Sequence, residues 1–197
     1  MDHMDYPTLK KLTEKFPNLI DSITAYLTTD VISDLKWRSL TSIDWQEFHE
    51  IKNTKFTALE VQHFGWRFPW EKDRSRGYIK DRRSYNAYLI EKNGSKILFG
   101  GDTTLTNKLN ILSDKNIDIA IMPIGAYDPW RQAHCTPEEA LKMADDIKAK
   151  FFFPIHTKTF RQGREPFEEP INRLKKAAGN YNIILAVDSI GQTFTIV

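Results

Sequence analysis

Cysteine is almost absent from this 197-residue sequence, because Cys135 is the only one. A single thiol cannot form an internal disulfide, and a chain without a cysteine framework suits a reducing compartment. Long apolar runs are lacking as well. The longest, Ile117 to Tyr127, is interrupted by Asp118 and two turn-forming residues and is shorter than the roughly 20 residues of a membrane span. We therefore predict a cytoplasmic protein without a transmembrane segment, and peripheral contact with a membrane stays open.

Leader, repeat and linker signatures are missing too. The first residues, Met1 to Asp5, form neither the basic nor the apolar region of a secretory signal. No segment repeats, and no low-complexity stretch divides the chain. With 41% hydrophobic and 12% aromatic residues, the chain can bury the core of one domain. We predict a single domain over residues 1–197.

Charge is nearly balanced, at a net +2, but it is unevenly placed. Between Arg67 and Arg83, seven bases face three acids, so this segment carries +4 and the remainder −2. The aromatic residues Trp66, Phe68, Trp70 and Tyr78 lie in or beside it. Such a loop could contact phosphates and stack on bases, or it could be a solvated loop of mixed charge. We expect no specific nucleic-acid partner.

Two helices are indicated by their caps. Asp5 is a good N-cap and Pro7 fits the first turn, which predicts an amphipathic helix that ends at Pro17. Thr136 to Glu139 combines an N-cap, a proline at the first helical position and a capping-box glutamate. Apolar periodicity adds a short helix near residues 30–35 and another over about 167–178.

Apolar and alternating segments predict strands between these helices. The expected strands are Ser22–Leu27, Ser39–Ile43, Phe56–Val61, Tyr85–Glu91, Lys96–Phe99, Ile117–Ile121, Phe151–Ile155, Ile183–Val187 and Thr193–Val197. Asn93 and Gly94 tolerate positive φ, so they favour a hairpin between the fourth and fifth of these. The alternation of strands and helices predicts an α/β fold.

Three predicted strands end at a residue that can bind a metal. His63, Asp102 and His156 each follow a strand, and the carboxyl ends of parallel strands meet at one edge of a sheet. Taken alone, each would be a core histidine or a turn aspartate. Together, imidazole and carboxylate groups suit zinc, iron or manganese. Gly100 and Gly101 would let the backbone turn sharply beside such a site.

Several motifs, in order along the chain, make this pattern more specific. They are Asp2-His3 before a helix, Val61-Gln62-His63, Gly100-Gly101-Asp102-Thr103, Met122-Pro123-Ile124-Gly125-Ala126-Tyr127, His134-Cys135-Thr136-Pro137-Glu138-Glu139-Ala140 and Pro154-Ile155-His156. This order resembles the metallo-β-lactamase superfamily, whose HxHxDH motif would end in the first pair. The branch that contains N-acyl-phosphatidylethanolamine phospholipase D is the most similar. The resemblance implies an αββα sandwich.

The resemblance also implies two metal sites. Asp2, His3 and His156 would hold one ion, His63 would help to hold the other, and Asp102 would bridge them. The ions would be Zn²⁺, with Mn²⁺ or Fe²⁺ as alternatives. His134 would lie near the substrate and stabilise or protonate a reacting oxygen, unless it is a surface histidine beside the helix.

The resemblance further implies that the chain begins within the fold. The first two histidines of HxHxDH would precede Met1, and so would the family's N-terminal sheet. Truncation, a misassigned start or a frameshift would each explain this. The expected consequence is a chain that holds one ion better than two.

The function implied is hydrolysis by a hydroxide that bridges the metals, with a phosphodiester such as a phospholipid-like headgroup linkage as substrate. Alternatives are a nuclease of the same fold that uses the basic loop, and an inactive fragment or binding module. Other residues are weaker candidates. Tyr127 and Trp130 would line the pocket or simply pack, Cys135 lacks a geometric argument for a nucleophile, and His49 has no motif around it.

Overall fold

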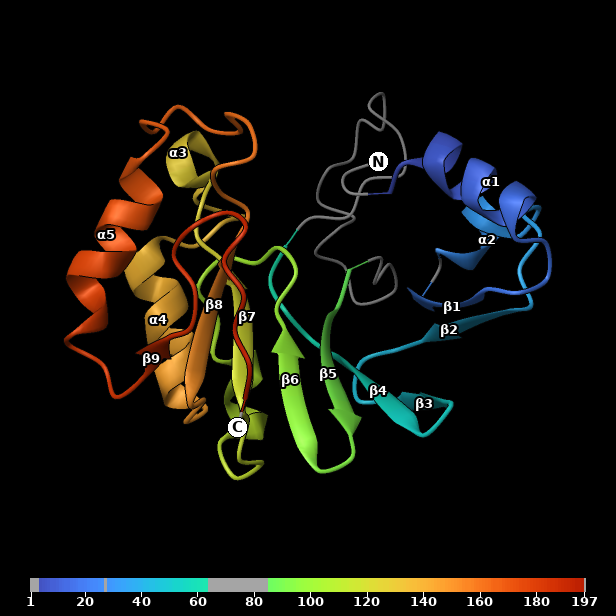
Figure 1. Cartoon of the computed structure of the whole chain (residues 1–197), viewed down its shortest axis with the longest axis horizontal. Coiled ribbons are helices and arrows are strands. Elements are labelled where there is room, and N and C mark those ends of the chain that lie inside the picture. Colours follow the sequence, from blue (N-terminus) through green and yellow to red (C-terminus); the bar gives the residue numbers. More distant parts are fainter. Residues whose placement is uncertain (1–3, 27, 64–84, 197) are drawn as a thin grey trace.

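Most strands of the protein form one mixed sheet. A computed structural model describes residues 4–26, 28–63 and 85–196 (Figure 1). Seven strands lie side by side in the order β3-β4-β5-β6-β7-β8-β9. Their bounds are β3 Phe48–Ile51, β4 Thr54–Leu59, β5 Ala87–Lys92, β6 Ser95–Phe99, β7 Ile119–Pro123, β8 Phe151–Ile155 and β9 Ile184–Leu185.

The directions of these strands decide where the site lies. β5 runs antiparallel to both β4 and β6, whereas β6, β7 and β8 are parallel. Five strands, β4, β6, β7, β8 and β9, therefore point the same way, and their carboxyl ends share one edge of the sheet. The sequence segments that follow these strands meet there.

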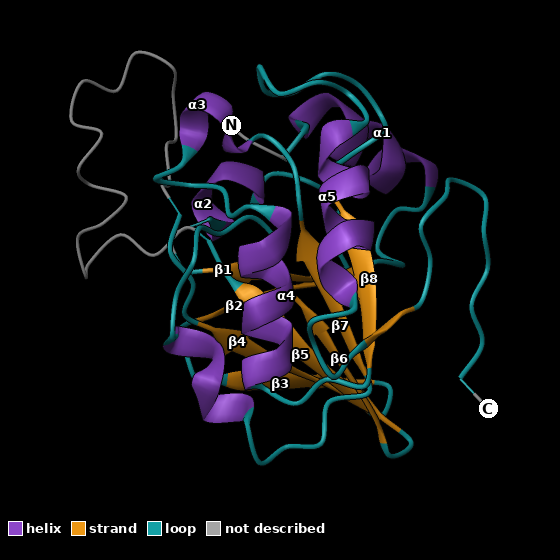
Figure 2. Ribbon diagram, turned by 90° about the vertical axis from the view of Figure 1, so that its left-hand side faces the viewer, coloured by secondary structure: helices purple, strands orange, loops and turns teal. Residues whose placement is uncertain are grey.

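Helices cover one face of the sheet. The helix α4, Pro137–Asp146, packs against β7 and against α5, Glu169–Ala178, and both lie in front of the sheet in Figure 2. The apolar core includes Leu98, Met122 and Leu174, all fully buried. This layering is the predicted α/β arrangement.

A smaller sheet and two helices form the other side of Figure 1. Here β1, Asp21–Ala25, pairs in parallel with β2, Ser39–Ile43, and β2 contacts β3. The helices are α1, Tyr6–Lys15, and α2, Thr29–Ile32. No helix within the described ranges is both long and apolar enough to cross a membrane.

Local signals explain most of these elements. The Asp5 carboxylate accepts from the Thr8 N–H at the start of α1, and Thr136 and Glu139 form the predicted capping box of α4. The β5–β6 hairpin turns through Asn93 and Gly94, both at positive φ. Two short helices complete the chain, a 3-10 helix over Lys108–Leu112 and α3 over Tyr127–Trp130.

Two strand predictions need correction. The expected strand Thr193–Val197 does not form over residues 193–196. Instead, Phe194 packs its ring against Phe151, with centroids 4.7 Å apart, so this segment is held by side-chain packing. The strand predicted over Ile183–Val187 is reduced to the two residues of β9, and β3 was not predicted.

Candidate metal centre

Four side chains from four connections meet at the carboxyl edge of the sheet. His63 follows β4, Asp102 follows β6, and His156 follows β8 directly. The fourth, His134, lies between α3 and α4 in the connection that leaves β7. The sequence predicted the first three from strand ends alone, and the structure brings them to one place.

The spacing of these groups suits a metal ion. One ligand atom each of His63, Asp102 and His134 lies within 4.8 Å of the other two. The Nε2 of His156 is 3.5 Å from the Asp102 carboxylate. The His134 ring stands edge-on to that of His63 at 5.3 Å and stacks on that of His156 at 5.0 Å between centroids. Asp102 is thus the group that the three histidines share.

The site is nearly closed to solvent. His63 and His134 are 4% and 6% exposed, and the side chains of Asp102 and His156 are 9% exposed. Buried charge is costly unless it is paired or coordinates a metal. A buried carboxylate among three imidazoles therefore fits a cation better than it fits an apolar core.

Comparison with known proteins agrees with this geometry. A family model described as "Beta-lactamase superfamily domain" matches residues 1–157. The chain belongs to this superfamily. An N-acyl-phosphatidylethanolamine-hydrolyzing phospholipase D of Caenorhabditis elegans is 25% identical over 188 residues, which cover 89% of this chain and 51% of that protein.

A further sequence relative and a solved structure are similar to most of this chain. An uncharacterised protein of Mycobacterium tuberculosis is 25% identical over 97% of this chain and 50% of its own length. A metallo hydrolase of Ignicoccus hospitalis superposes with a TM-score of 0.64 at 14% identity, over 95% of this chain and 73% of the other. The metallo-β-lactamase fold is thereby confirmed. The chain spans about half the length of the curated relatives it matches.

Three glycines of the sequence motifs lie where backbone segments pass close to one another or where φ is positive. Gly101 has a φ of +60° directly before Asp102, and a Cβ on Gly100 would lie 2.7 Å from the sulfur of Met122. A Cβ on Gly125 would lie 2.2 Å from the carbonyl oxygen of His156. The loops after β6, β7 and β8 therefore approach more closely than side chains would permit.

A backbone carbonyl sets the orientation of His156. Its Nδ1 is 3.3 Å from the Gly125 oxygen. Because a carbonyl only accepts, Nδ1 carries the proton, and Nε2 is directed toward Asp102. Ligating histidines commonly donate their second nitrogen in this way.

Arg131 supports the segment that carries His134. Its guanidinium binds Glu139 with two hydrogen bonds of 2.8 and 2.6 Å and donates to the His134 carbonyl at 3.2 Å. This ion pair lowers the pKa of Glu139. No motif in the sequence indicates this role for Arg131.

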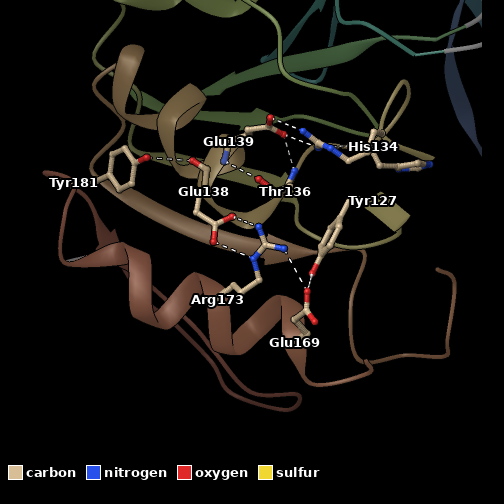
Figure 3. A network of polar contacts seen from close by, with 9 residues as sticks. Tyr127, His134, Thr136, Glu138, Glu139, Glu169, Arg173 and Tyr181 are labelled. Carbon is tan, nitrogen blue, oxygen red and sulfur yellow. Dashed lines mark hydrogen bonds and ion pairs between the residues drawn. The ribbon is translucent and has the colours of Figure 1, made fainter. Parts of the chain in front are cut away.

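Of the weaker candidates, Tyr127 has a structural role. Tyr127 is buried, its hydroxyl donates to Glu169 at 2.8 Å, and Arg173 lies 4.9 Å above its ring (Figure 3). Burial and this hydrogen bond raise the pKa of the Tyr127 phenol. Trp130 is 44% exposed. Tyr127 therefore joins the loop after β7 to α5.

Cys135 is not suited to act as a nucleophile. Its thiol is buried against the Pro123 carbonyl at 3.3 Å, and burial raises its pKa strongly. A thiolate nucleophile needs the opposite shift. His49 lies in β3, paired with Phe56, away from the four site residues.

Some predicted features lie outside the described residues. These are the proposed ligands Asp2 and His3 and the basic segment from Arg67 to Arg83. One important residue was missed within the described part. The carboxylate of Glu165, which is 8% exposed, accepts from the N–H groups of Ala126 at 2.5 Å and Asp128 at 3.3 Å, and no motif marks it.

Proposed function

We propose that the protein is a metal-dependent hydrolase of phosphodiesters whose reacting centre contains His63, Asp102, His134 and His156. The observation that carries this proposal is the convergence of three imidazoles and one carboxylate, all buried, at the edge where β4, β6 and β8 end. Membership of the superfamily supports the reaction class.

The donor set fits first-row divalent ions. Asp102 and His156 would help to hold one ion, with Asp2 and His3 as further proposed ligands, and His63 would help to hold a second that shares Asp102. Imidazole and carboxylate suit Zn²⁺, and also Mn²⁺ and Fe²⁺. A bound ion supplies Lewis acidity, which lowers the pKa of water and neutralises charge on an oxygen of the substrate.

The residues of the chain have separate tasks in this proposal. The Asp102 carboxylate lies within 4.8 Å of a ligand atom of both His63 and His134 and 3.5 Å from the Nε2 of His156, so it fixes the spacing of the centre. The carbonyl of Gly125 keeps His156 in one tautomer. His134 protonates the leaving oxygen, which general acids achieve from hydrogen-bonding distance. Burial of all four groups keeps bulk water away from the reacting atoms.

The proposed substrate is a phospholipid-like or other phosphodiester. Its support is the similarity to phospholipases D of Caenorhabditis elegans and Saccharomyces cerevisiae that hydrolyse N-acyl-phosphatidylethanolamine. The enzyme would act on a small molecule or lipid in the cytoplasm.

Hydrolysis of bis(p-nitrophenyl) phosphate tests this function. Turnover by the Zn²⁺- or Mn²⁺-loaded chain should stop with chelator and with His63→Ala, and should persist with His49→Ala. p-Nitrophenyl acetate tests the reaction class in parallel. A loaded chain without diester turnover, or turnover unaffected by His63→Ala, would contradict the proposal and favour the non-catalytic alternative.

We also propose that the protein has no specific nucleic-acid partner. Titration with labelled RNA and DNA should show no tight complex. Sub-micromolar binding that weakens steeply with salt, and that is lost when Arg82→Ala and Arg83→Ala are combined, would overturn this and favour a nuclease.

A further inference from the structure

Thr103, beside Asp102, lies where the backbones of three site segments meet. Its side chain is fully buried. The hydroxyl accepts from the Gln62 N–H at 3.1 Å and donates to the Thr104 carbonyl at 2.8 Å. Its own carbonyl accepts from the Cys135 N–H at 2.9 Å.

These hydrogen bonds involve residues that are next in sequence to the side chains of the site. Gln62 precedes His63, Thr103 follows Asp102, and Cys135 follows His134. Thr104 adds to the junction, because its N–H donates to the Gln62 carbonyl at 2.9 Å and its hydroxyl donates to the Arg131 carbonyl at 2.8 Å. The connections after β4 and β6 and the one before α4 are thus joined through two consecutive threonines.

We propose that the hydroxyl of Thr103 is a positioning group that sets the separation of His63, Asp102 and His134. Metal and catalytic groups must be held within about 0.5 Å of their working geometry, and partners behind the ligands commonly change metal affinity by about 10–100-fold. Thr103 is next to Asp102 in the sequence. In the described part of the chain, no other neighbour of Asp102 has a side chain that hydrogen-bonds to the backbone of Gln62, the residue before His63. The inference rests on the proposed metal-dependent function.

A hydroxyl is needed at this point, and a methyl group is not sufficient. Valine has nearly the shape of threonine, but it cannot accept from Gln62 or donate to Thr104. Thr103→Val would therefore leave the partly buried Gln62 N–H without its acceptor, and the His63 segment would move to satisfy it. Thr103→Ser retains the hydroxyl and removes only the methyl group.

The test combines metal affinity with a spectroscopic signature in the full 197-residue chain. Zn²⁺ affinity is measured by competition with a chromophoric chelator, and Co²⁺ supplies the ligand-field spectrum. Thr103→Val should weaken Zn²⁺ binding about 10-fold or more and alter the Co²⁺ spectrum. Thr103→Ser should restore both. Thr13→Val is the matched control, because Thr13 is equally buried and its hydroxyl donates within α1; it should lower stability alone.

Imidazole resonances of the metal-free chain distinguish this inference from the proposed function. In ¹H–¹⁵N spectra, Thr103→Val should shift the side-chain signals of His63 and His134, and Thr13→Val should not. If Thr103→Val fails to fold, Thr103→Ala gives the same comparison without the added methyl group. Unchanged imidazole signals and an unchanged Co²⁺ spectrum in a folded Thr103→Val or Thr103→Ala chain would overturn the inference, even where the hydrolase proposal holds. Absence of any metal binding, with shifted imidazoles, would count against the function alone.

Discussion

Asp102 is the carboxylate of the centre, and each of the three histidines lies near it. The sequence predicted Asp102, His63 and His156 from their place after strands. It could not predict His134 in that way, since His134 follows a loop and a short helix; only the resemblance suggested it. Thr103 acts through backbone contacts between distant segments, and Arg131 acts through its side chain on Glu139 and the His134 carbonyl. No pattern along the chain reveals such contacts.

The role of His134 can be separated from that of a ligand. We predict that His134→Ala lowers diester hydrolysis about 10²–10⁴-fold, the usual contribution of a general acid, and leaves Zn²⁺ affinity nearly unchanged. Steady-state rates and chelator competition on the same preparation measure both. A parallel loss of Zn²⁺ would show that His134 is a ligand, which its distance from His63 and Asp102 also permits.

Glu139 gives a prediction for acid stability. The hydrogen bonds from Arg131 lower its pKa in the folded chain below the value of about 4.3 for a free glutamate. Its charge therefore contributes stability above that value, and the contribution is lost as the pH falls through the folded-state pKa. Glu139→Gln should lower the free energy of unfolding at pH 7 by about 1 kcal/mol or less, and the difference should shrink as the pH falls below about 4.3. Urea unfolding at pH 7 and over a series of acidic pH values measures this, and a difference that stays constant would contradict it.

At the scale of elements, signals that depend on few residues were sufficient to predict several helices and strands. The Asp5 N-cap, the capping box of Thr136 and Glu139 and the Asn93-Gly94 hairpin predicted α1, α4, β5 and β6 closely. The hairpin between β3 and β4 was missed because it turns through Lys52 and Asn53, at φ +48° and +61°, and lysine is not a turn signal. Residues 193–196 were predicted as a strand from their alternation, which does not reveal whether a partner strand is available.

Gly125 lies where the segments after β7 and β8 approach each other, and adding one methyl group there tests that approach. In Gly125→Ala, the new Cβ would lie 2.2 Å from the His156 oxygen, so β7 and β8 would have to separate where they carry the site. We expect a loss of about 1–3 kcal/mol or more in the free energy of unfolding, together with weaker Zn²⁺ binding. Urea titration and chelator competition measure the two effects.

Gly179→Ala is the matched control for this substitution. Gly179 lies at the C-terminal cap of α5 with φ −65° and open space around its Cα. Its replacement by alanine should be neutral or slightly stabilising. Equal stability of the two alanine variants would show that the close approach of Gly125 and His156 is not required.

For the molecule as a whole, the shared direction of β4, β6, β7 and β8 explains why residues distant in the sequence form one site. The alternation of strands and helices predicted the α/β fold, and the family model and the solved structures confirmed it. The order of strands in the sheet depends on long-range pairing, such as β6 with β7, and could not be predicted from local patterns.

The affinity of the dialysed chain for Zn²⁺ tests the central claim most directly. Competition with a chromophoric chelator should show tight binding that His156→Ala and Asp102→Asn each weaken by roughly 100-fold or more, beyond the effect of partners behind the ligands. His49→Ala should bind as the unaltered chain does, because His49 lies in β3. Tight Zn²⁺ binding that survives Asp102→Asn, or an unaltered chain that binds no metal, would contradict the account.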